Sequence, residues 1–134
     1  MKTSIVLLLI MFNIFGVFAQ NNSNTHMYND TTILYIEVDE LPKFQSDNFN
    51  TVLEYIYYNI KYPSLFDGQG RVIVSFVVTK CGKVEQVRIE KSLCTECDNE
   101  VKRVLLSMPK WRAGKKNNQY VNTLLFLSVN FKLQ

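Results

Sequence analysis

Residues 70–91 read GRVIVSFVVTKCGKVEQVRIEK, and this stretch decides the fold. Its first part, residues 71–79, is rich in β-branched and aromatic side chains whose apolar members alternate, as in a strand with one buried face. Gly82 stands where the chain has to reverse, and glycine accepts the positive φ that tight turns require. The alternation resumes at Val84 and slips once before Val87, which predicts a β-bulge. The stretch therefore predicts an antiparallel hairpin.

A helical period flanks this hairpin on both sides. The first predicted helix begins near Ser46 or Asp47, because either side chain can cap a helix. Its apolar stripe recurs at helical spacing and consists of Phe49, Val52, Leu53, Ile56 and Ile60. Pro63 follows the end of this helix. A second helix is predicted from about Asp98 to Ser107, and Pro109 stops it because proline cannot continue a helix.

Two further strands complete the predicted fold. The first is Thr32 to Val38 (TILYIEV), and the second, Tyr120 to Leu133, is the longest in the chain. A basic loop, residues 111–116, precedes this last strand. The order is β-α-β-β-α-β, so we expect an α+β fold in which two helices pack on one face of a small antiparallel sheet.

The N-terminal part of the chain indicates export. A basic start, an apolar run from Ile5 to Phe18 and small residues before the junction predict a signal peptide over residues 1–19, cleaved after Ala19. The alternative is an anchor retained in the inner membrane, but a bilayer span needs about 20 apolar residues and this run is shorter. Residues 20–31 are polar, and we interpret them as a flexible leader. The predicted domain is therefore residues 32–134.

Length and composition exclude several functional classes. With 134 residues, 47% of them hydrophobic, the chain is long enough for one domain and too apolar to be disordered. With a single histidine, the chain lacks residues that His-dependent triads and most zinc sites need. We expect no catalysis, metal, cofactor or small-molecule substrate. Residues 20–70 carry two basic and seven acidic side chains, and residues 71–134 carry twelve and five. This asymmetry indicates either a basic face for an anionic partner or, as we favour, two solvated faces. Export argues against nucleic acid as the partner.

Cys94 and Cys97 form a C-x-x-C motif just before the second predicted helix. Three interpretations are open: a local disulfide or free thiols, a thiol-exchange site activated by a helix N-terminus, or part of a zinc site. We favour the first, because thioredoxin-type sites follow an early strand of a βαβ unit. Cys81 lies at the far end of the intervening strand, roughly 26 Å away at about 3.3 Å per residue, so we exclude it as their partner.

Several short motifs of this chain occur in an order that resembles one protein family. They are Tyr62-Pro63, Gly70-x-Val72-x-Val74-x-Phe76-x-Val78, Gly82-x-Val84-x-x-Val87, Asp98-x-Glu100-x-x-Arg103-Val104, Met108-Pro109-Lys110-Trp111-x-x-Gly114 and Val129-x-Phe131-x-Leu133. Together they cover roughly residues 33–133 and resemble the C-terminal domain of TonB in the form common in Bacteroidetes-type bacteria. We interpret most of the motif as structural, namely Tyr62, Pro63, Gly70, Gly82, Asp98, Glu100, Pro109, Trp111 and Gly114.

The chain departs from the family pattern at three places. Residues 64–69 are fewer than usual, Gln45-Ser46-Asp47 replaces a Pro-Gly-Gly, and Ser128 stands where the family usually has proline. The chain also resembles the receptor-contacting end of TonB without its inner-membrane helix and long proline-rich spacer. The polar leader of 12 residues reaches at most about 40 Å. We therefore expect a stand-alone, TonB-like periplasmic domain and not a complete energy transducer.

The resemblance implies protein binding by β-augmentation. In this family a receptor segment, the TonB box, lies along an exposed edge strand and forms main-chain hydrogen bonds with it. In this chain the resemblance assigns the contact to Tyr120, Val121, Asn122, Thr123, Leu124, Leu125 and Phe126. The implied partner is an outer-membrane TonB-dependent receptor. Two alternatives stay open: a homodimer through the same strand, or an adaptor domain not coupled to transport.

Overall fold

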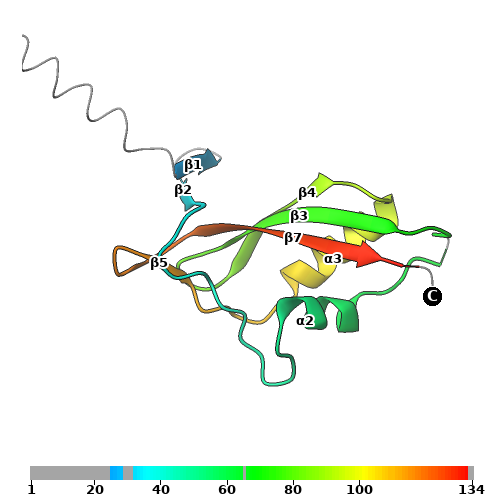
Figure 1. Ribbon diagram of the computed structural model, residues 1–134, viewed down its shortest axis with the longest axis horizontal. Helices are drawn as coiled ribbons and strands as arrows, with labels where there is room; N and C mark the ends of the chain where they lie inside the picture. Colours follow the sequence, from blue (N-terminus) through cyan, green and yellow to red (C-terminus); the bar gives the residue numbers. More distant parts are fainter. Residues whose placement is uncertain (1–24, 29–31, 65, 133–134) are drawn as a thin grey trace, which may run out of the picture.

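The hairpin expected from residues 70–91 forms one side of a five-stranded sheet (Figure 1). The structure, a computed structural model, describes residues 25–28, 32–64 and 66–132. The sheet has the strand order β1-β2-β7-β3-β4. Its members are β1 (Thr25–Tyr28), β2 (Thr32–Tyr35), β3 (Gly70–Val78), β4 (Val84–Lys91) and β7 (Thr123–Phe131). All pairs are antiparallel except β2 and β7, which run parallel and pair only at Tyr35 and Thr123.

The turn between β3 and β4 has the expected geometry. Gly82 has a φ of 83°, and the amide of Thr79 donates to the carbonyl of Lys83 at 2.9 Å. The predicted bulge is confirmed, because the register shifts between Ser75 and Val77 and Gln86 adopts a φ of 51°. Both features follow from local sequence, so they could be located before any tertiary contact was known.

Two helices cover one face of the sheet, which confirms the α+β class. They are α2 (Val52–Asn59) and α3 (Thr95–Leu106). The buried side chains between helices and sheet form one cluster: Ile56, Val72, Val74, Phe76, Val78, Cys97, Val101, Val104, Leu105, Trp111, Val129 and Phe131. On the opposite face Leu34, Val77 and Leu124 form a small second cluster. Burying one such aliphatic side chain stabilises the fold by about 1.5–3 kcal/mol, so the larger cluster dominates.

The first helix is shorter than expected and has a different cap. Thr51, and neither Ser46 nor Asp47, is the N-cap, and its hydroxyl accepts from the amide of Glu54 at 3.1 Å. The reason is the Thr-x-x-Glu spacing, which is typical of a capping box and places the first turn at Val52. The predicted stripe residue at position 49 therefore precedes the helix.

The second helix begins earlier than expected, at Thr95 instead of Asp98. Cys94 is its N-cap, and the carboxylate of Asp98 accepts from the amide of Leu93 at 3.2 Å and from the hydroxyl of Ser92. An acidic residue in the first turn serves these donors and suits the positive end of the helix dipole. Asp98 thus stabilises the helix start from inside the first turn.

The last strand is not continuous, which corrects the predicted strand from Tyr120 to Leu133. Residues 114–121 form a separate hairpin of β5 (Gly114–Lys116) and β6 (Gln119–Val121), and β7 begins after Asn122. Asn117 and Asn118 have φ values of 50° and 61°, as in the type I′ turns that suit two-residue hairpins. The loop predicted at residues 111–116 therefore ends inside a hairpin.

The N-terminal side of the sheet also differs from expectation. The predicted strand Thr32 to Val38 ends at Tyr35. The chain then follows the β5–β6 hairpin: Glu40 forms an isolated bridge to Lys115 of β5, and Lys43 forms one to Arg112, which precedes β5. The segment interpreted as a leader contains β1, which pairs with β2. The predicted signal peptide lies outside the described residues. Within the described part of the chain, neither helix is long and apolar enough to cross a membrane.

Candidate partner-binding site

The outer side of β7 exposes main-chain groups, as do the outer sides of β1 and β4, the terminal strands of the sheet. β3 pairs with β7 along all nine residues without a register shift. In an antiparallel pair a residue directs both its N–H and its C=O to the same neighbour, and successive residues alternate. The amide of Asn130 and the carbonyl of Asn122 both bond to groups on the side away from β3. The even-numbered residues of β7 therefore face outward.

The two ends of this outer side differ in whether another strand lies against them. At the beginning, the amide of Tyr35 donates to the carbonyl of Asn122 at 3.0 Å, and Tyr35 pairs with Thr123. Beyond this pairing, no other strand of the described residues lies against β7 on that side. We call the outer side of β7 from Leu125 to Phe131 the free edge. Its outward residues are Phe126, Ser128 and Asn130.

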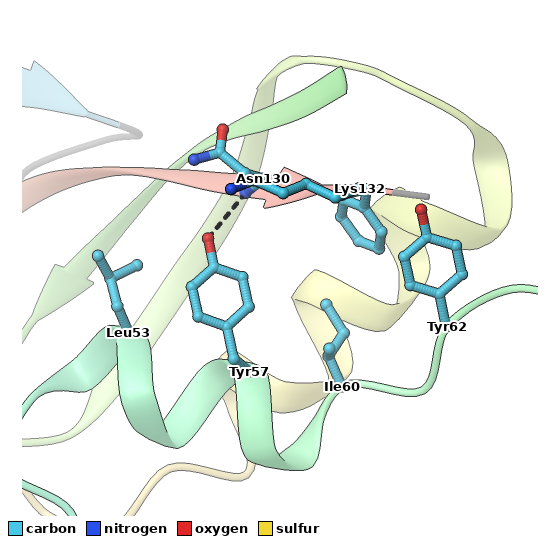
Figure 2. A pocket seen from close by; sticks show the side chains of 7 residues that line it. Leu53, Tyr57, Ile60, Tyr62, Asn130 and Lys132 are labelled. Carbon is cyan, nitrogen blue, oxygen red and sulfur yellow. Dashed lines mark hydrogen bonds between the residues drawn. The ribbon is translucent and has the colours of Figure 1, made fainter. Parts of the chain in front are cut away.

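Tyr57 of α2 reaches this edge from below (Figure 2). Its hydroxyl oxygen accepts a hydrogen bond from the main-chain amide of Asn130 at 3.0 Å. A groove of about 640 Å³ runs between α2 and the end of β7 beside this bond. Most of its lining is apolar or aromatic, and it consists of Leu53, Tyr57, Ile60, Tyr62, Asn130, Phe131 and Lys132. The groove is continuous with the free edge, since Asn130 and Phe131 belong to both.

The end of α2 is held in place by α3. The carboxylate of Glu100 forms an ion pair with Arg103 at 2.8 Å and accepts from the amide of Lys61 at 2.8 Å. The guanidinium of Arg103 also donates to the carbonyl of Asn59 at 2.9 Å. The hydrogen bond from Arg103 lowers the pKa of Glu100, and the amide of Lys61 contributes in the same direction. This clamp fixes the end of the helix that carries Tyr57.

A second hollow, of about 460 Å³, adjoins the end of the free edge. Three cationic side chains line it, those of Arg71, Lys91 and Lys132. Within the described part of the chain, no carboxylate forms an ion pair with any of them. We call these three residues the basic end of the edge, because an anionic group placed there would meet uncompensated positive charge.

The structure separates the edge residues expected from the sequence. Tyr120 and Val121 belong to β6, and the side chain of Asn122 accepts from the amide of Lys80. The other four lie on β7: Thr123 and Leu124 at its covered beginning, Leu125 on the helix-covered side, and Phe126 on the free edge, 56% exposed. Sequence reasoning missed Ser128, Asn130 and the groove residues of α2. The alternation of β7 could have indicated the first two, but nothing local links Tyr57 to a strand 73 residues away.

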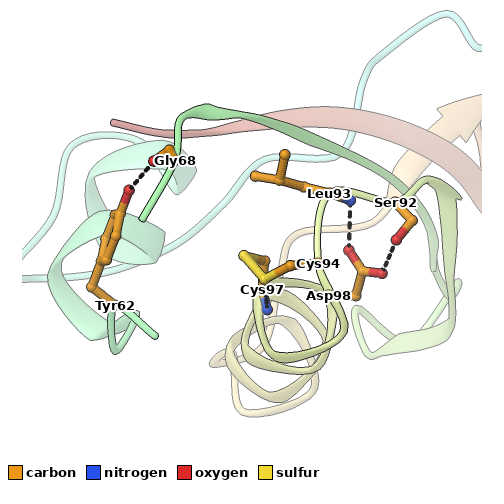
Figure 3. The surroundings of a disulfide bond; sticks show 7 residues. All are labelled: Tyr62, Gly68, Ser92, Leu93, Cys94, Cys97 and Asp98. Atoms are coloured by element: carbon orange, nitrogen blue, oxygen red, sulfur yellow. Dashed lines mark hydrogen bonds between the residues drawn. A yellow bond between two sulfur atoms is a disulfide. The ribbon is translucent and has the colours of Figure 1, made fainter. Parts of the chain in front are cut away.

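The C-x-x-C motif is a disulfide in this structure (Figure 3). The Cα atoms of Cys94 and Cys97 are 5.0 Å apart, and Cys81 is a free, exposed cysteine elsewhere. Cys97 is fully buried in the core and Cys94 caps α3, so both sulfur atoms contribute to packing. The described residues contain no cluster of three or more potential metal ligands.

The glycine and tryptophan motif residues lie at close contacts within the fold. A Cβ at Gly82 would meet the carbonyl oxygen of Trp111 at 2.0 Å, and one at Gly70 would meet Leu93 at 2.5 Å. A Cβ at Gly114 would lie 2.5 Å from the hydroxyl of Thr123. Trp111 is 5% exposed, and its ring contacts those of Phe44 and Phe76.

The remaining motif residues hold chain segments together. Tyr62 donates from its hydroxyl to the carbonyl of Gly68 at 3.3 Å, and Pro63 beside it is buried. Asp98 and Glu100 make the α3 contacts already described, and Pro109 follows the end of that helix. None of these contacts requires a ligand to explain the residue.

Comparison with known proteins identifies the family. The family model described as the Gram-negative bacterial TonB protein C-terminal matches residues 66–133, which include β3, β4, α3 and β7. No curated protein matches the chain. The matched segment is just over half of the chain and contains the free edge and the basic end. The chain therefore belongs to the family of the TonB C-terminal domain.

Proposed function

We propose that this protein is a TonB-like module of the periplasm that binds a segment of an outer-membrane receptor along the free edge of β7. The observation that carries the proposal is the unpaired main chain of this edge. The outward groups of Phe126 and Ser128 have no hydrogen-bonding partner among the described residues. An exposed edge strand is a template for a further strand, and main-chain hydrogen bonds supply the affinity.

Family membership supports the general assignment. The TonB C-terminal family acts in energy transduction and protein interaction and is not a family of enzymes, and its place is the cell envelope. The closed C-x-x-C motif agrees with an oxidising compartment, where disulfides persist. Coupling to transport and the identity of the receptor are the parts that this proposal adds.

Charge favours a segment of another protein over a second copy of the chain. The basic end carries three cations without an ion pair in the described residues. Residues 119–132, which contain β6 and β7, include no aspartate or glutamate. A twin strand would therefore bring no carboxylate to the basic end, whereas a receptor segment with an acidic residue would complement it. We expect the affinity for such a segment to fall as salt is raised.

Phe126→Pro tests the edge with little disturbance of the fold. The amide of Phe126 faces outward, so proline removes a donor without breaking a bond to β3, and edge strands tolerate proline. Phe126→Ala keeps the donor, lacks the same ring and is the matched control. The probes are peptides from the periplasmic N-termini of the host's TonB-dependent receptors, measured by calorimetry.

We expect Phe126→Pro to remain folded by circular dichroism and to bind at least about threefold more weakly than Phe126→Ala, since one net hydrogen bond is lost. Equal binding by the two variants would exclude the free edge as the site. If no receptor peptide binds the parent protein, and sedimentation shows a dimer that Phe126→Pro dissociates, the edge serves self-association instead.

A further inference from the structure

We propose that Tyr57 gates the free edge: its hydroxyl holds the amide of Asn130 in the unbound protein, and a partner strand that covers the whole edge displaces it. In the closed state one hydrogen bond joins the two residues, from the main-chain amide of Asn130 to the hydroxyl oxygen of Tyr57. The identity of the displacing partner rests on the proposed function.

The gate follows from a competition for one donor. A strand added beside β7 must place a carbonyl oxygen against each outward amide that it pairs with. At Asn130 that position is already taken by the phenolic oxygen of Tyr57, 3.0 Å from the nitrogen (Figure 2). One amide hydrogen forms one strong hydrogen bond, so tyrosine and partner strand exclude each other there. The amides of Phe126 and Ser128 have no such competitor in the described chain.

The side chain of Tyr57 is free enough to move. It is 44% exposed, and the groove beside it provides space on the side of α2. Rotation of an exposed side chain takes picoseconds to nanoseconds, so displacement does not require the helix to move. The helix end is held by the clamp of Glu100 and Arg103, which keeps the ring close to the edge in both states.

The groove indicates the chemistry of the partner strand. Side chains of an added strand alternate between the two faces of the sheet. Those on the helix-covered face would enter the groove lined by Leu53, Ile60 and the ring of Tyr57. This lining favours an extended segment with aliphatic side chains at every second position. The intervening residues of the added strand would face the side of the sheet opposite the helices, near Phe126 and the basic end.

Tyr57→Phe opens the gate and keeps the wall of the groove, because it removes only the hydroxyl. Tyr58→Phe is the matched control: Tyr58 is the next residue of the same helix, is 78% exposed, and contacts Phe49 through its ring. The first measurement is amide hydrogen exchange of the unbound full-length protein by NMR. We expect the Asn130 amide to exchange faster in Tyr57→Phe and at the parental rate in Tyr58→Phe. An unchanged Asn130 rate in Tyr57→Phe would overturn the closed state.

The second measurement is affinity for a capped heptapeptide that alternates valine with threonine. It is long enough to cover the free edge and carries no charge. We expect Tyr57→Phe to bind it about three- to tenfold more tightly than the parent, the range of one net hydrogen bond. Tyr58→Phe should match the parent. Equal or weaker binding by Tyr57→Phe would overturn the gate, even if Phe126→Pro shows that the edge is the site.

The two proposals fail in different ways. If the heptapeptide behaves as expected but no receptor peptide binds, the receptor assignment falls and the gate stands. If receptor peptides bind and respond to Phe126→Pro but not to Tyr57→Phe, the function stands and the gate falls.

Discussion

The two ends of β7 are held in opposite ways. At its beginning, Thr123 is fully buried, pairs with Tyr35 and lies under the closely packed Gly114. Leu124 is buried on the face of the sheet opposite the helices, where it belongs to the second cluster. At its end, Asn130 is exposed, and its outward amide bonds only to the hydroxyl of an exposed tyrosine. We call these the closed end and the open end of β7.

This difference separates the parts of the sheet that stabilise the fold from the edge that we propose as the binding site. Stability comes from the uninterrupted pairing with β3 and from the helix-covered core, both of which lie away from the free edge. The open end can therefore exchange one hydrogen-bonding partner for another at little cost to the fold. Substitutions near the closed end should affect unfolding, whereas those at the open end should affect exchange and binding.

The largest effect is expected for Trp111→Ala. Trp111 is 5% exposed, and its amide donates to the carbonyl of Gly82. Gly82 lies in the turn after Val78, the residue of β3 that pairs with Thr123 at the closed end. Removing a buried aromatic ring costs about 3–5 kcal/mol, measured as the free energy of unfolding in urea. Phe126→Ala, at an exposed ring on the free edge, should cost less than about 1 kcal/mol. Similar losses for the two variants would contradict the contrast between the ends.

Gly82→Ala should have the next largest effect. A φ of 83° costs alanine about 1–2 kcal/mol, and the new Cβ would lie 2.0 Å from a main-chain oxygen, which must move at a further cost of about 1–3 kcal/mol. We expect a total loss of about 2–5 kcal/mol by urea unfolding. Gly68→Ala is the comparison, because it meets only the ring of Phe66 at 3.1 Å. A neutral Gly82→Ala would show that the turn can be remodelled.

Local signals allowed much of the centre of the fold to be predicted. Alternating apolar residues in β3, the glycine at position 82 and the slip before Val87 each report on the backbone within a few residues. Two local signals were available but overlooked. Thr51-x-x-Glu54 marks the start of α2, and Asn117-Asn118 marks the turn that divides the last strand.

The candidate site was less accessible to sequence reasoning, because it depends on contacts between distant segments. The run from Tyr120 to Phe126 reads as one strand, yet its beginning pairs with β5 and its middle is covered by Tyr35. Which amides of β7 face outward follows from its register with β3 and from the bonds of Asn122 and Asn130. The alternation of side chains indicates which face of β7 is buried, but not on which side of it the strand β3 lies.

The disulfide provides a third test, within the helix-covered core that supplies stability. Cys94 and Cys97 adjoin Leu93, which packs on Gly70, the residue opposite Phe131. Closing so short a loop should stabilise the protein by about 2 kcal/mol in the chain-entropy model. We expect the double variant Cys94→Ser and Cys97→Ser to lose at least that amount by urea unfolding, since it also places a hydroxyl in the core at position 97. Cys81→Ser, at the free cysteine, is the control and should be neutral.

The smallest effect is expected for Glu100→Gln, and its sign depends on pH. The hydrogen bond from Arg103 lowers the pKa of Glu100 from 4.5, so the folded state favours the charged carboxylate. The resulting stabilisation is present above about pH 4.5 and is lost as the pH falls through the lowered pKa. Because this ion pair is partly exposed, we expect a difference of less than about 1 kcal/mol at pH 7. Stability curves of parent and variant should converge in acid, whereas Glu96→Gln, on the same helix, should not reproduce this.

If the clamp positions Tyr57, Glu100→Gln should also speed exchange of the Asn130 amide at pH 7; an unchanged rate would show that α2 holds the gate without α3.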